Sequence, residues 1–166
     1  MQLLITRTDI AQYRQIAKTS NNDKLNEMIL DAQMQDLAPL IGEKLYNKLL
    51  KPSDEHEALL SGGPYEYNGE TYTNYGLKMV LSYFAYARYM MFASVVDTPY
   101  SVVEKLNPDS RPADISAKKA IYNLNRDNAF KIWDNVKNYL TRTNHPDFNR
   151  NTTQQPSQRL RFTKIG

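Results

Sequence analysis

The sequence predicts a mainly α fold: a helical bundle with a small β-hairpin and an extended C-terminal tail. Three observations lead to this prediction. The stretch from Leu77 to Val96 lacks proline and glycine and holds the densest run of large apolar and aromatic residues. An Asn-Gly pair at 68–69 separates two short runs rich in Tyr and Thr. The chain ends in a segment rich in Asn, Thr and Gln, a composition that cannot bury enough apolar surface to order itself.

The stretch from Leu77 to Val96 is predicted to be the central helix, because its length gives about five to six turns. Its apolar residues cover two nearly opposite faces, so it needs packing partners on both. These are Leu77, Leu81, Phe84, Met91 and Val95 on one face, and Met79, Tyr83, Tyr86 and Met90 on the other. A membrane span would have this length, but a central Arg88 costs about 2.5 kcal/mol or more in hydrocarbon. The sequence therefore favours a soluble core or a subunit interface.

Arg88 lies within about 20° of Leu81 and Phe84 on the helical projection, which leaves two interpretations open. It is either partly buried and paired with a carboxylate, from Glu104 or a neighbouring chain, or it snorkels to the surface. In the first case we expect it to belong to an interface. The tyrosines at helical spacing, Tyr83, Tyr86, Tyr89 and Tyr122, are interpreted as core or interface residues in preference to platforms on which bases stack.

Short helices are predicted before the central one. The first begins after an N-cap at Thr6 or Thr8 and continues to about residue 17, and a second begins near Asp23. Pro39 and Gly42 are expected to interrupt it, after which residues 43–50 form two more turns. A short acidic helix is predicted over residues 54–60, and Gly62 and Gly63 end it.

A two-stranded hairpin with a type I′ turn is predicted near residues 65–72, because Asn68 and Gly69 tolerate the positive φ angles of that turn. A lone hairpin is marginally stable in water, so it must lie on the helices or on another subunit. Tyrosine on an exposed hairpin is common at protein interfaces. We therefore expect Tyr65, Tyr67 and Tyr72, with the Asn-Gly turn, to make protein contacts.

After the central helix, Thr98 and Pro99 predict a turn, and residues 100–105 are β-branched enough to be extended. A loop over 107–112 precedes a last helix from about residue 113 to 140. Its apolar stripe contains Asn125 and Asn128, whose amides should bond to another helix unless that part of the stripe is exposed to solvent.

The chain of 166 residues, 41% apolar, suits one core, so residues 1–142 are predicted to form a single helical domain and 143–166 an extended tail. The lack of cysteine points to synthesis in a cytosol, and no signal or lipidation motif precedes the first helix. From residue 142 onward five basic residues stand against one aspartate, a net charge of +4, which leaves −1 for residues 1–141, so the basicity of the chain belongs to the tail. Arg159, Arg161 and Phe162 lie in an alternating run, RLRFTKI, that could add as a strand to a partner.

Catalysis has little support in the sequence. The two histidines, His56 and His145, lack an HExxH or CxxC context, and no phosphate loop, dinucleotide fingerprint or GxSxG elbow is present. His56 stands among acidic residues and is interpreted as part of a solvated helix start. We expect no enzyme activity, no cofactor and no metal site.

Several segments resemble the head–tail connector (neck or ring) proteins of tailed phages, most of all those of Bacteroidetes phages, including crAss-like phages. They are DAQMQDLAPLIGEKLYNKLL, LLSGG with the Asn-Gly hairpin, and GLK...YFAYARY...DTPYSVVEK before a long helix that ends near YLTRTNHPDF. The resemblance covers residues 1 to about 148, and many relatives carry Phe and Gly where Tyr100 and Ser101 stand.

The resemblance implies a virion protein, made in the host cytoplasm, that assembles as a ring, commonly of twelve copies, below the portal. Such a ring links the DNA-filled capsid to the tail, with the portal, other neck or tail proteins and the packaged DNA as contacts, and no membrane. The alternative hypothesis is a small helical nucleic-acid-binding module that uses the basic tail. Electrostatic DNA binding would weaken steeply with salt.

Overall fold

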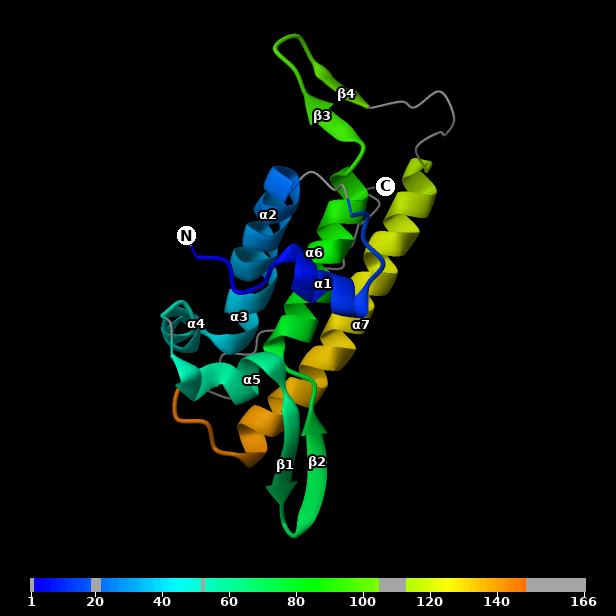
Figure 1. Ribbon diagram of the computed structural model, residues 1–166. Helices are drawn as coiled ribbons and strands as arrows, with labels where there is room; N and C mark the ends of the chain where they lie inside the picture. The colour runs from blue at the N-terminus through cyan, green and yellow to red at the C-terminus, as the bar shows by residue number, and fades with distance from the viewer. Residues whose placement is uncertain (1, 19–21, 52, 105–112, 149–166) are drawn as a thin grey trace, which may run out of the picture.

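The computed structural model describes residues 2–18, 22–51, 53–104 and 113–148, and within them the fold is mainly α with two small hairpins (Figure 1). The helical segments are α1 (Arg7–Tyr13), α2 (Asn22–Asp31), the π-helical η1 (Ala32–Leu37), α3 (Ala38–Ile41), α4 (Glu43–Leu49), the 3₁₀ turn η2 (Asp54–His56), α5 (Glu57–Ser61), α6 (Leu77–Phe92) and α7 (Ile115–Arg142). The strands are β1 (Gly63–Tyr67), β2 (Glu70–Asn74), β3 (Val95–Asp97) and β4 (Val102–Glu104). The predicted fold class is confirmed.

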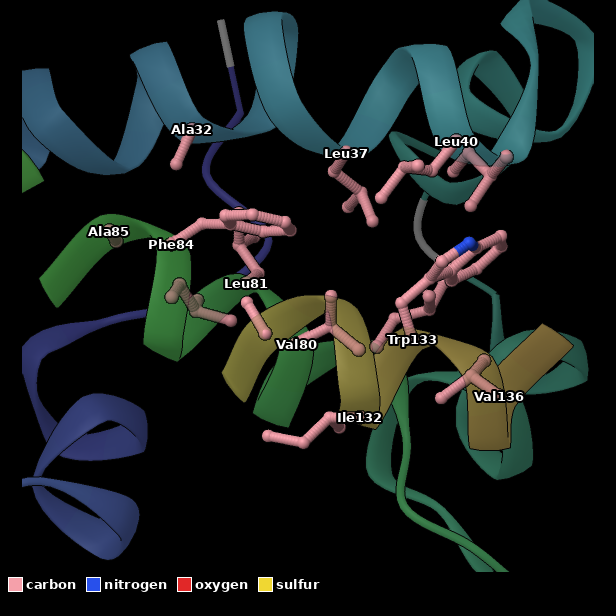
Figure 2. Packing of buried hydrophobic residues seen from close by; sticks show 14 of the residues in the cluster. Ala32, Leu37, Leu40, Val80, Leu81, Phe84, Ala85, Ile132, Trp133 and Val136 are labelled. Carbon is pink, nitrogen blue, oxygen red and sulfur yellow. The ribbon is translucent and has the colours of Figure 1, made fainter. Parts of the chain in front are cut away.

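Helix α6 is the centre of the molecule, with α2 and α7 on its two sides and α1 across it (Figure 1). Its buried face meets side chains of η1, α3 and α7, as Figure 2 shows. The labelled core residues are Ala32, Leu37, Leu40, Val80, Leu81, Phe84, Ala85, Ile132, Trp133 and Val136. Each large apolar side chain buried in this way stabilises the fold by about 1.5–3 kcal/mol. No helix of the described ranges is both long and apolar enough to cross a membrane.

The central helix is shorter than predicted. It ends at Phe92, and Val95 and Val96, which we expected to be helical, belong to β3. These β-branched residues pair with Glu104 and Val103 of β4, so tertiary pairing overrides the apolar helical pattern at this point. Of residues 100–105, which we expected to be extended, Val102–Glu104 form the strand β4, whereas Tyr100 lies in the turn and residue 105 is outside the described ranges. The sequence had not shown that β4 pairs with Val95–Asp97 as a second hairpin.

The N-terminal helices follow the predicted order with two differences. Helix α1 starts at the predicted N-cap, Thr6, which forms a capping box with Asp9, but it ends at Tyr13 instead of near residue 17. The expected interruption at Pro39 is wrong. In η1 the turns widen, and the Ala38 N–H donates to the Gln33 carbonyl five residues back, so Pro39 sits at the start of α3, where its missing N–H is tolerated. Gly42, with φ of 83°, ends α3 as predicted.

Helix α7 is buried over its C-terminal half and exposed over its N-terminal half. Trp133 and Val136 are in the core, whereas Ile115 is 64% and Leu124 61% exposed. Asn125 is buried, but its Nδ2 donates 2.7 Å to the Ile121 carbonyl of the same helix, so the expected bond to another helix is absent for this residue. The other alternative, exposure to solvent, does not hold for Asn125 either, since only stripe residues nearer the start of the helix are largely exposed, and Asn128 is half-buried.

The predicted boundary between body and tail at residue 142 is wrong. Residues 143–148 turn back and pack on the body, with Asp147 only 9% exposed and Phe148 against Trp133. The folded body therefore extends at least to Phe148. The predictions for the tail, which include Arg159, Arg161 and Phe162, fall outside the described residues.

Candidate interaction surfaces

The hairpin formed by β1 and β2 has the predicted turn. Asn68 and Gly69 have φ of 54° and 80°, as a type I′ turn requires, and Tyr67 pairs with Glu70 across it. Asn135 of α7 ties the base of the hairpin to the body, since its Nδ2 donates 3.0 Å to the Thr73 carbonyl and its Oδ1 accepts from the Tyr75 N–H at 2.9 Å. This hairpin thus lies on its own helix α7.

The three hairpin tyrosines gather around Arg142, in the last turn of α7. The Arg142 guanidinium lies 4.1 Å from the ring centre of Tyr72 and 5.3 Å from that of Tyr67, and its Nη1 donates 3.0 Å to the Tyr65 hydroxyl. Tyr65 also packs edge-on against Tyr139 at 4.9 Å. Each cation–π contact at a partly exposed site contributes about 0.5–1 kcal/mol.

The aromatic face of this hairpin therefore has a partner within the chain. The exposed residues Glu66 of β1 and Thr71 of β2 are polar, and Thr71 Oγ1 donates a hydrogen bond to Glu66 Oε1 at 2.6 Å. Contact of Tyr65, Tyr67, Asn68, Gly69 and Tyr72 with another subunit stays a prediction. Sequence reasoning missed Arg142 because it counted this residue among the tail charges. Its place in the last turn of α7, where the helix dipole favours a cation, was the available signal.

Arg88 is partly buried and paired with a carboxylate, as the first of the two interpretations predicted. Its Nε donates 2.7 Å to Asp36 Oδ2, and the two side chains are 17% and 8% exposed. Burial opposes the charge, but the hydrogen bond and the charge of Asp36 outweigh it and raise the pKa of Arg88. The suggested partner Glu104 is wrong, since Glu104 pairs with Lys118. A turn of helix η1, far away in sequence, supplies the carboxylate.

The second hairpin, β3 and β4, extends from the opposite end of the bundle (Figure 1). Two lysines of the body hold its base. Lys24 of α2 donates to the Val95 carbonyl, and Lys118 of α7 contacts both Ser94 Oγ, at 2.7 Å, and Glu104. The bonds to Ser94 and Lys118 lower the pKa of Glu104, with that to Lys118 as the larger cause. The hairpin is thus anchored between α2 and α7.

Among the described residues, most of the large apolar side chains that are exposed lie at this end of the molecule. We define the apolar end as Phe92, Tyr100, Val102, Val103 and Ile115, which are 46%, 97%, 64%, 44% and 64% exposed. All but Tyr100 line one open cavity of about 430 Å³ between the hairpin and the start of α7. On the α2 side, a second cavity of about 580 Å³ is lined by Met28, Phe92, Val95 and Val102, with Glu27 and Asp97 at its rim.

The apolar end has the character of a protein interaction surface. Single exposed apolar residues are normal, but a contiguous group rimmed by charges is typical of a contact site. Strand β4 contributes to this surface, because its three residues are all exposed. Its outer edge also has no strand partner among the described residues, so its backbone could pair with a strand of another protein. Sequence reasoning recognised the β-branched run but did not single it out as a site, because β-branched residues are equally common in buried strands.

The two histidines are close together, which the sequence did not predict. His56 is 6% exposed, so its interpretation as part of a solvated helix start is wrong, and its ring centre lies 6.4 Å from that of His145. Asp147 is the one acidic residue of the segment 143–148, which follows α7 and contains His145. Within the described ranges, no group of three or more His, Asp or Glu residues has the placement to hold a metal ion.

Comparison with known proteins gives one match. The model of a family described as "Family of unknown function (DUF6712)" matches residues 37–158, which is most of the chain, so the chain belongs to that family. The matched range includes α6, both hairpins and α7, and it starts at the last residue of η1. No curated protein and no solved structure matches the chain.

Proposed function

We propose that this member of the DUF6712 family is a structural virion protein, a subunit of the head–tail connector ring of a tailed phage. In this role it links the capsid to the tail below the portal, and it acts by binding to other proteins and to copies of itself. The proposal rests on the resemblance of residues 1 to about 148 to such connectors and on one structural observation.

That observation is the apolar end. Val102 and Val103 of β4, whose outer edge has no strand partner among the described residues, together with Phe92 and Ile115, expose apolar surface that a lone chain in water leaves uncovered. Fully burying one exposed side chain of this kind on assembly contributes up to about 1.5–3 kcal/mol to the binding free energy. A few of them therefore supply a substantial part of the free energy of a specific contact. A ring subunit needs contacts of this kind, repeated from copy to copy. The two hairpins at opposite ends of the bundle also suit a protein that has neighbours on two sides (Figure 1).

The test is the state of assembly of the purified full chain, measured by native mass spectrometry and by imaging of negatively stained particles. We expect closed rings of one defined copy number. Val102→Glu places a charge in the contact and should weaken association at least about tenfold. Asn138→Glu introduces the same charge on the exposed side of α7 and should leave the rings intact.

Two results would contradict the proposal. One is a chain that stays monomeric at all concentrations and fails to bind purified portal. The other is equal assembly of Val102→Glu and Asn138→Glu. A shift of DNA that weakens steeply between low and moderate salt, without ring formation, would instead favour the nucleic-acid-binding module.

A further inference from the structure

Helix α7 ends in a hydrogen-bonded turn that sends the chain back over the body. The His145 N–H donates 3.0 Å to the Leu140 carbonyl, and the Asn144 N–H donates 3.3 Å to the Thr141 carbonyl. Asn144 has φ of 47°, so the bonds and the left-handed residue together form a Schellman motif, and Pro146 prevents the helix from continuing. We call residues 143–148, which follow from this turn, the strap.

The first attachment of the strap is the histidine pair. His145 lies against His56 at the end of η2, and its Nδ1 accepts a hydrogen bond from the Asp147 N–H at 3.4 Å. An acceptor nitrogen carries no proton, so this contact requires the neutral ring. Burial lowers the pKa of His145 below its ordinary value of 6.5, and the nearby His56 and Lys48 act in the same direction, whereas Asp147 and Glu55 act against it.

The second attachment is Asp147, which lies between two lysines of α4. Its Oδ1 is 2.8 Å from Lys44 Nζ and its Oδ2 is 2.6 Å from Lys48 Nζ, while its own side chain is 4% exposed. These two hydrogen bonds lower the pKa of Asp147 to about 2, so the carboxylate keeps its charge at any pH at which His145 titrates.

The third attachment is aromatic. The ring of Phe148 meets Trp133 edge-on at 6.1 Å, and Trp133, which is the only tryptophan of the chain, is 3% exposed. The strap thus covers part of the indole.

We propose that the strap is a pH-sensitive latch: the neutral ring of His145, packed against His56, holds it closed on α4 and η2, and protonation of His145 at mildly acidic pH opens it. Opening breaks the contact of Phe148 with Trp133 and frees Phe148, the last described residue, from the body. The latch does not depend on the ring proposed above.

The direction of the pH effect follows from the geometry. The closed strap binds a proton at His145 more weakly than the open strap does, so closure is favoured above pH 6.5 and loses free energy as the pH falls below that value. A protonated His145 would also face the cation of Lys48 and lose its bond from the Asp147 N–H. For one titrating group, the ratio of open to closed strap rises up to about tenfold for each pH unit below 6.5, until the closed state is protonated as well.

The emission of Trp133 in the full chain measures the opening. Between pH 8 and pH 4.5 we expect its maximum to shift to longer wavelength with a midpoint below 6.5, while the far-ultraviolet circular dichroism stays unchanged. Phe148→Ala provides the open reference and should be shifted already at pH 8. His145→Gln keeps a polar side chain that does not titrate, so the transition should disappear.

An emission transition that persists in His145→Gln, or one that coincides with loss of circular dichroism, would overturn the latch. If His145→Gln does not fold, the ring proton resonances of the two histidines in the unchanged chain decide the question. The His145 titration must then have the same midpoint as the Trp133 emission, and different midpoints would refute the proposal.

Discussion

The pair of Arg88 and Asp36 allows the sharpest test of the packing around α6. Arg88→Met keeps most of the side-chain volume, removes the charge and leaves the Asp36 carboxylate, which is 8% exposed, without its 2.7 Å partner. Leaving one member of a buried pair uncompensated costs about 3 kcal/mol, which is roughly a hundredfold in the folding equilibrium. For a chain of this size that corresponds to a drop of about 6–12 °C in Tm.

Denaturation in urea of matched variants measures this cost. Lys78→Met is the control, because Lys78 lies on the same helix and pairs with Glu57 at 3.3 Å, but the two side chains are 26% and 60% exposed. An exposed pair contributes at most about 1 kcal/mol, so this control should lose little. The double variant Arg88→Met with Asp36→Leu should regain most of the stability, because no buried charge remains. Equal losses in Arg88→Met and Lys78→Met would refute the reasoning.

Three further predictions concern the hairpin turn, the strap and the tail. Gly69→Val should cost about 1–2 kcal/mol, because a side chain finds free space there but φ is 80°, and it should impair assembly more than folding; normal incorporation into rings would exclude this hairpin from the interface. Asp147→Asn should lower the urea midpoint at pH 7, where the closed strap holds the carboxylate between Lys44 and Lys48, and should leave it nearly unchanged at pH 2, where the strap is open and these contacts are lost. Unequal midpoints at pH 2 would contradict that account. Truncation after residue 149 should leave a folded chain that fails to form stable rings, and wild-type assembly by the truncated chain would be the contrary result.

Local patterns in the sequence were enough to predict most elements and the fold class. The Asn-Gly pair determined the turn of the first hairpin, and Thr6 determined the start of α1, because turns and caps depend on a few neighbouring residues. The apolar pattern of α6 predicted that it needs partners on two faces, which α1, α2 and α7 provide.

The tertiary structure decided which distant residues meet. Asp36, and not Glu104, pairs with Arg88, and Arg142 joins the hairpin tyrosines, because a single sequence carries no signal for contacts between residues 52 or 77 positions apart. The histidines, 89 positions apart, are brought together by a Schellman turn that needs a left-handed Asn144, a conformation that asparagine tolerates but does not require. Val95 and Val96 form a strand because they pair with β4, and Lys24 of α2 and Lys118 of α7 hold the base of this hairpin, contacts that the local apolar pattern does not signal.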